Sequence, residues 1–145
     1  MIGEWAFIVN KLNLSNVTLL SLNCVDPIQS VKALMYSSRY INFAEIILVS
    51  NEKPKNLPNQ IKFVKTHSKT HEDSCRFSYE ELPNLINTDY MLGIHDDGFV
   101  INPHLWDWNF FNYDYIGAPW KNYGQRNRVD RKSTRLNSSH VSESR

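Results

Sequence analysis

Two short, almost continuous apolar runs with one amphipathic segment between them limit the folds open to this chain. Residues 17–24 and 43–50 are rich in strand-forming residues and end at turn signals, Asp26-Pro27 after the first and Asn51 with Pro54 after the second. Both runs predict buried strands. Pro27 suits the first turn of a helix, and apolar side chains recur at helical spacing through residues 27–39. Strand, helix and strand in this order are typical of a parallel sheet covered on both faces, so the predicted fold class is α/β.

Three further elements are expected along the chain. Residues 61–66 predict a short strand. Residues 79–86 predict a helix, with Ser78 as its N-cap and Glu81 completing a capping box. Residues 89–95 predict a third core strand, and we expect it to lie in one largely parallel sheet beside the strands at 17–24 and 43–50.

Length and composition indicate one folded, soluble domain. The chain has 145 residues, of which 41% are hydrophobic and 12% aromatic, which argues against a disordered chain or a coiled coil. Residues 1–120 hold 9 Lys+Arg against 13 Asp+Glu, so the folded part is mildly acidic and does not suggest a nucleic-acid partner. Two cysteines are too few for a disulfide framework. Because no signal peptide or membrane-spanning run is apparent, we expect a cytoplasmic location.

The apolar stretch 88–102 is interrupted by His95-Asp96-Asp97-Gly98. Neighbouring carboxylates repel each other unless a cation or hydrogen-bond donors compensate them. Proteins hold Mg²⁺ or Mn²⁺ with a nucleoside diphosphate through one or two carboxylates, with water and phosphate in the other positions. The imidazole of His95 suits Mn²⁺ better than Mg²⁺. The alternative is an ordinary Asp-Asp-Gly turn between two strands.

The residues around this interruption resemble a known family. The matching segments are Tyr90-Met-Leu-Gly-Ile-His-Asp-Asp-Gly-Phe-Val-Ile-Asn-Pro103, Trp106 and Tyr113-Asp-Tyr-Ile-Gly-Ala-Pro-Trp120. They resemble the core of an uncharacterised family of proteins proposed to be glycosyltransferases with a GT-A-like fold, over about residues 15–123. The resemblance implies a Rossmann-like, largely parallel sheet with flanking helices, incomplete at its C-terminal end. It also implies that the chain binds a nucleoside-diphosphate sugar as donor and transfers the sugar to an unknown acceptor.

The resemblance further implies a metal site. GT-A enzymes hold a divalent metal through an Asp-x-Asp motif at the end of a central strand, and the matching triplet here is His95-Asp96-Asp97. Asp97 and His95 are therefore the expected ligands of Mn²⁺ or Mg²⁺. Residues on a strand alternate between its two faces, which would also place positions 95 and 97 on one side. Because the first position is a histidine, donor binding without a metal stays an alternative.

Four residues are expected to handle the donor. Asn23 and Asp26, in the turn after the first strand, are expected to contact the nucleoside. Asp96 is expected to bind the donor and to orient it or metal-bound water, and Asp114 to face the sugar, which makes these two the candidate catalytic residues. The alternative for Asp114 is the cap of a turn.

A rival interpretation keeps the same binding edge without catalysis. The chain would then be a non-catalytic module that binds a nucleotide or a glycan, or an inactive fragment. Aromatic residues are dense from Trp106 to Tyr123 and could serve as platforms for sugar rings.

The expected organisation has three parts: an N-terminal extension at residues 1–14, the donor-binding part at 15–126, and a disordered tail at 127–145. Residues 121–145 carry 7 Lys+Arg against 2 Asp+Glu. Residues 131–145 resemble translated adapter sequence, so we expect the tail to be foreign to the protein and not to pack on the domain. The alternative is a genuine disordered basic tail.

A second possible site combines His67, His71 and Cys75. Their spacing would align three zinc ligands along one face of a helix. No apolar residue between positions 66 and 74 would hold such a helix against a core, so we expect a solvated loop instead.

Overall fold

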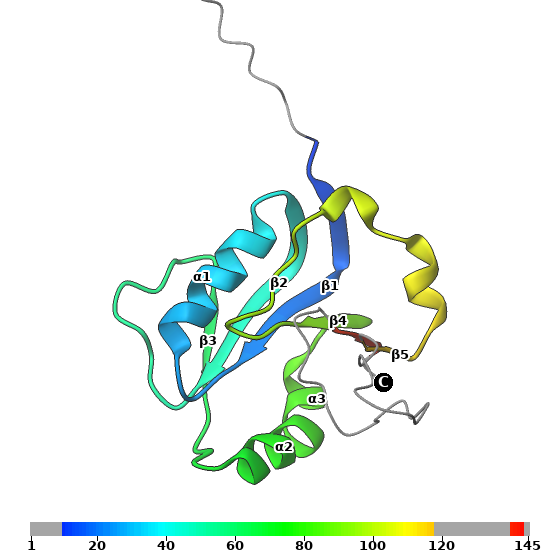
Figure 1. The fold of residues 1–145 in the computed structure, drawn as a ribbon. Helices are drawn as coiled ribbons and strands as arrows, with labels where there is room; N and C mark the ends of the chain where they lie inside the picture. Colours follow the sequence, from blue (N-terminus) through cyan, green and yellow to red (C-terminus); the bar gives the residue numbers. More distant parts are fainter. Residues whose placement is uncertain (1–9, 118–139, 144–145) are drawn as a thin grey trace, which may run out of the picture.

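The computed structural model describes residues 10–117 and 140–143. Its centre is one sheet with the strand order β3-β2-β1-β4-β6-β5 (Figure 1). The strands are β1 (Leu12–Leu22), β2 (Ile41–Ser50), β3 (Lys62–Lys65), β4 (Tyr90–Gly93), β5 (Tyr115–Ile116) and β6 (His140–Glu143). The first four pair in parallel, whereas β6 pairs antiparallel with β4 and β5. The α/β class is confirmed, and the three predicted core strands are adjacent as β2, β1 and β4.

Helices cover both faces of the sheet. Helix α1 (Pro27–Ser38) packs on one face, as predicted, and α2 (His71–Glu80) with α3 (Leu82–Leu85) packs on the other (Figure 1). Two short 3-10 helices, η1 (Pro103–Leu105) and η2 (Trp108–Asn112), lie between β4 and β5. No helix in the described ranges has the length and apolar content needed to cross a membrane.

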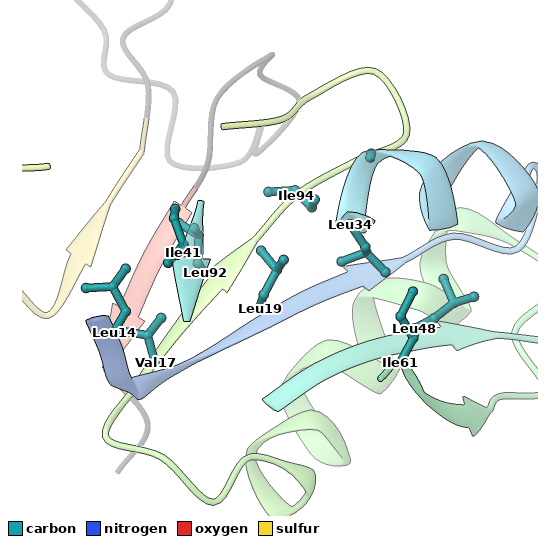
Figure 2. Packing of buried hydrophobic residues seen from close by; sticks show 10 residues of the cluster. Leu14, Val17, Leu19, Leu34, Ile41, Leu48, Ile61, Leu92 and Ile94 are labelled. Carbon is teal, nitrogen blue, oxygen red and sulfur yellow. The ribbon is translucent and has the colours of Figure 1, made fainter. Parts of the chain in front are cut away.

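The core consists of two apolar clusters, one on each face of the sheet. Leu19 belongs to the cluster under α1, together with Leu34 and Leu48, and Figure 2 shows these side chains between the helix and the sheet. Leu20, the next residue, belongs to the cluster under α2 and α3, together with Phe77. Successive strand residues point to opposite faces, so an unbroken apolar run is what a strand between two helical layers requires.

The start of β1 differs most from the predicted strand boundaries. Strand β1 begins at Leu12, inside the segment expected to be an extension, because Leu14 is buried and residues 12–14 pair with β2. The register then shifts between Leu14 and Thr18.

The predicted helix over 79–86 is helical in part, but its start is wrong, because residues 79–80 end α2 and Leu82–Leu85 forms α3. Thr70 is the N-cap, its capping-box partner is Asp73, and the helix that follows ends at Glu80. Ser78, the predicted cap, lies inside this helix and donates its hydroxyl to the Ser74 carbonyl at 2.9 Å. Pro83 falls in the first turn of α3, where its missing N–H removes no helical hydrogen bond.

The chain after β4 turns back over the α1 face of the sheet. The Gly98 amide donates to the His95 carbonyl at 3.2 Å, so residues 95–98 form a turn, as the alternative interpretation had it. Residues 99–101 do not form a second strand. Instead, the Val100 amide donates to Ser37 Oγ on α1 at 3.0 Å.

Part of the tail enters the sheet. His140–Glu143 forms β6 and pairs with all four residues of β4, so these residues differ from the expected disordered tail. The other tail residues that were expected to be disordered lie outside the described residues.

Candidate functional site

The strand order creates a switch point between β1 and β4. From β1 the chain crosses to β2 and β3 on one side, and it then returns to β4 on the other side of β1. The loops after β1 and β4 therefore leave the same edge of the sheet in different directions, which is where ligands of open α/β sheets bind. We call residues 23–26 and 94–98 the switch-point loops. The Ile94 amide donates to the Leu20 carbonyl at 2.8 Å and holds the two strand ends together.

Asn23 organises the first switch-point loop. Its side-chain oxygen accepts the amides of Val25 and Asp26 at 2.8 and 2.9 Å. Its side-chain nitrogen donates to the Asp26 carbonyl at 3.2 Å and to Ser30 Oγ at 3.0 Å. The predicted nucleoside residue therefore sits at the switch point, with its hydrogen bonds directed into its own loop.

Asp26 caps α1 beside it. Its Oδ1 accepts the Gln29 amide at 3.0 Å, which satisfies one of the free amides at the start of the helix. Asp26 as a residue is exposed. The structure thus brings Asn23 and Asp26 together, as expected.

The second loop carries the tandem carboxylates. His95 and Asp96 are half-buried, while Asp97 is exposed. The three side chains do not alternate between the faces of a strand, as was expected for positions 95 and 97, because β4 ends at Gly93 and all three residues lie in or beside the turn. The three residues are consecutive in the chain, and the turn after β4 keeps them at one edge of the sheet.

Asp114 lies away from these residues. It directly precedes β5, where Tyr115 is level with Met91 of β4 through their common partner Ser142. Asp114 is therefore level with the start of β4, whereas the 95–98 turn follows the end of β4, roughly 15 Å further along the strand direction. Strand β5 is also two strands away from β4 in the sheet. The structure does not bring Asp114 next to Asp96 and Asp97.

The second candidate site is incomplete. His71 and Cys75 both lie on α2, with Nε2 and Sγ 3.5 Å apart, so the loop predicted for residues 71–74 is wrong. The capping box and the buried Phe77 hold this helix. The loop prediction rested on the lack of apolar residues over 66–74, a range that ends before Phe77, and it did not take the Thr70–Asp73 cap into account. His67 precedes the helix. Across the described part of the chain, no three His, Cys, Asp or Glu side chains are grouped so as to hold a metal by themselves.

The comparisons with known proteins agree with this architecture. Residues 57–141, more than half of the chain, match the family described as "Protein of unknown function (DUF5672)". The chain belongs to this family. A solved structure described as the apo-form glycosyltransferase GlyE of Streptococcus pneumoniae TIGR4 has a similar fold, with a TM-score of 0.51 and 10% identity. The match covers 89% of this DUF5672 member and 34% of the GlyE chain, so our chain spans about a third of that protein. No curated protein matches in sequence.

Two further residues at the switch point of this DUF5672 member were not singled out by the sequence. Val25 is 95% exposed at the tip of the first loop, and Ser30 is fully buried beneath it. Neither residue type signals a role by itself. The Asn-x-x-Asp spacing of Asn23 and Asp26 before a helix was the available signal, since Asn and Asp side chains bond to nearby backbone in turns and caps.

Proposed function

We propose that this chain is the donor-binding part of a glycosyltransferase and that its switch-point loops bind a nucleoside-diphosphate sugar. The observation that carries the proposal is the meeting of tandem carboxylates with the β1–α1 loop at the switch point. Open α/β sheets bind ligands at such points, and the fold is similar to that of a glycosyltransferase. The acceptor would bind outside the part of the fold described here.

The residues present fit a divalent metal that is bound together with the donor. Mg²⁺ and Mn²⁺ sites of this kind use one or two carboxylates plus substrate phosphates, so a cluster of three protein ligands is not required. Asp97, being exposed, would be the first ligand, with His95 beside it. A metal bound there would offset charge on the departing diphosphate. Asp96, half-buried in the same turn, would orient the donor through its carboxylate.

Calorimetry with nucleoside diphosphates tests the proposal. The full chain is titrated with UDP, GDP, ADP and CDP, with Mn²⁺, with Mg²⁺ or with a chelator. We expect saturable binding of at least one nucleotide, and we expect chelation to weaken it. If none of the four binds under any of the three conditions, the proposed function is wrong.

The Asp97→Asn variant should lose metal-dependent nucleotide binding more than Asp96→Asn does. Removing an anionic oxygen from a hard-cation site weakens the binding of the metal. We therefore expect a loss of about tenfold or more in nucleotide affinity with Mn²⁺. The same titrations with chelator present serve as the control, because Asp97→Asn should behave like wild type there. A larger effect of Asp96→Asn would reassign the metal ligand.

Exposed aromatic side chains favour a second candidate function, glycan binding without catalysis. Trp108 of η2 is held against Phe111, with ring centroids 5.9 Å apart, yet it is largely exposed. Such a ring offers an apolar face to a sugar. Under this interpretation Trp108→Ala would abolish glycan binding. The wild-type chain would neither hydrolyse nor transfer a bound donor, so an assay for released nucleoside diphosphate would detect none.

A further inference from the structure

Asn23 has no hydrogen-bonding capacity left for a ligand. An asparagine side chain offers two acceptor positions and two donor hydrogens. The amides of Val25 and Asp26 fill the first two, and the Asp26 carbonyl and Ser30 Oγ use the others. A direct bond from Asn23 to a nucleoside would have to break one of these four.

The bond to Ser30 ties the loop to the helix that follows. Ser30 is in the first turns of α1 and has no exposed surface, and its amide donates to the Asp26 carbonyl at 3.2 Å. On the other side, the Asn23 amide donates to the Val49 carbonyl of β2 at 3.0 Å. The loop is thus fixed to β2 at its start and to α1 at its end (Figure 1).

We propose that Asn23 is a positioning residue, which holds the first switch-point loop in its binding conformation through Ser30, and is not itself a ligand contact. This inference rests on the proposed function, since it concerns the same edge of the sheet. The loop then presents groups other than the Asn23 amide, above all the exposed side chains of Val25 and Asp26. A loop ordered before binding avoids the entropy of ordering it in the complex.

Ser30 makes the inference testable, because a fully buried side chain cannot touch a bound nucleotide. Any effect of Ser30→Ala on nucleotide affinity must therefore pass through the loop. A double-mutant cycle of Asn23→Ala and Ser30→Ala measures this coupling. Ser38→Ala is the matched control, because Ser38 is a buried serine of the same helix whose hydroxyl bonds only within α1, to the Met35 carbonyl at 3.2 Å.

Affinity for the nucleoside diphosphate identified above, with Mn²⁺, is measured for all four variants by calorimetry. We expect Ser30→Ala to weaken binding by about threefold to tenfold, as the loss of one supporting hydrogen bond allows. Asn23→Ala removes all four hydrogen bonds and should weaken binding at least as much. The double variant should lose no more than the larger single effect, and Ser38→Ala should bind like wild type. Thermal unfolding accompanies each titration. If Asn23→Ala does not fold, the contrast between Ser30→Ala and Ser38→Ala decides alone.

Two outcomes overturn the inference. If Ser30→Ala binds like wild type, or if the two losses simply add, Asn23 does not act through Ser30, although the proposed function would stand. If wild type binds no nucleoside diphosphate at all, the proposed function fails and the inference fails with it.

Discussion

At Asp73, one carboxylate fixes the start of a helix that the apolar pattern does not reveal. Its Oδ2 accepts the amides of Lys69 and Thr70 at 2.9 and 3.0 Å, and Thr70 Oγ1 accepts the Asp73 amide in return. The hydrogen bond from the Lys69 amide is the largest of the causes that hold the pKa of Asp73 below its ordinary value of 3.8. The carboxylate form is therefore the one that the folded chain favours.

We accordingly expect Asp73→Asn to lower stability at neutral pH and to matter less in acid. A group whose pKa is depressed by folding contributes stability above its unfolded value, and that contribution is lost as the pH falls from about 4 through the lower folded value. Urea unfolding at pH 7, 5 and 3 measures the difference between variant and wild type. Glu72→Gln is the control, because its ion pair with Arg76 is long at 3.9 Å and exposed. If the difference in unfolding free energy between Asp73→Asn and wild type stays constant down to pH 3, the Asp73 carboxylate charge does not have the stabilising role assigned to it.

At the scale of elements, α2 is held by one aromatic side chain. Phe77 is 4% exposed and packs with Leu20, Ile47 and Val49, whereas Tyr79 on the same helix is 83% exposed. The helix has only this one buried residue, so its contact with the sheet depends on a single anchor. This also explains why periodicity did not predict it, since one buried position defines no repeat.

Phe77→Ala should therefore destabilise the chain by about 3–5 kcal/mol, the usual loss for a large aromatic removed from a core. Tyr79→Ala should change stability by less than about 0.5 kcal/mol. Chemical denaturation of both variants checks this pair. Equal effects would mean that α2 does not dock through Phe77.

The elements with continuous apolar runs were predictable, and the candidate site was predictable only in part. The runs at 17–24 and 43–50 face two layers, so nearly every side chain carries the signal. Asn23 and Asp26 were placed correctly, because a turn between a strand and Pro27 must lie at the sheet edge. The faces on which Asp96 and Asp97 lie were not predicted correctly, because the sequence did not show that β4 stops at Gly93. The position of Asp114 relative to the turn after β4 was not predictable, because it depends on pairing through β6, far along the chain.

At the scale of the whole molecule, the apolar core that the structure describes belongs to the part of the chain before β5. Among the residues that the structure describes, every member of the two apolar clusters, and every residue packed against them, lies from Leu12 to Phe111. Strand β6 adds backbone pairing to β4. The sheet from β3 to β4, with its three helices, thus holds the apolar core that the structure describes.

Deleting residues 128–145 should lower the melting temperature by no more than a few degrees, because every described residue of the two apolar clusters is retained. Leu19→Ala, at a fully buried position of β1, is the comparison within the full chain and should cost about 2–5 kcal/mol. Differential scanning calorimetry of the deletion variant and of Leu19→Ala places both on one scale. If the deletion costs as much as Leu19→Ala, β6 is part of the cooperative unit, and the pairing of β4 with β6 contributes as much as a core side chain.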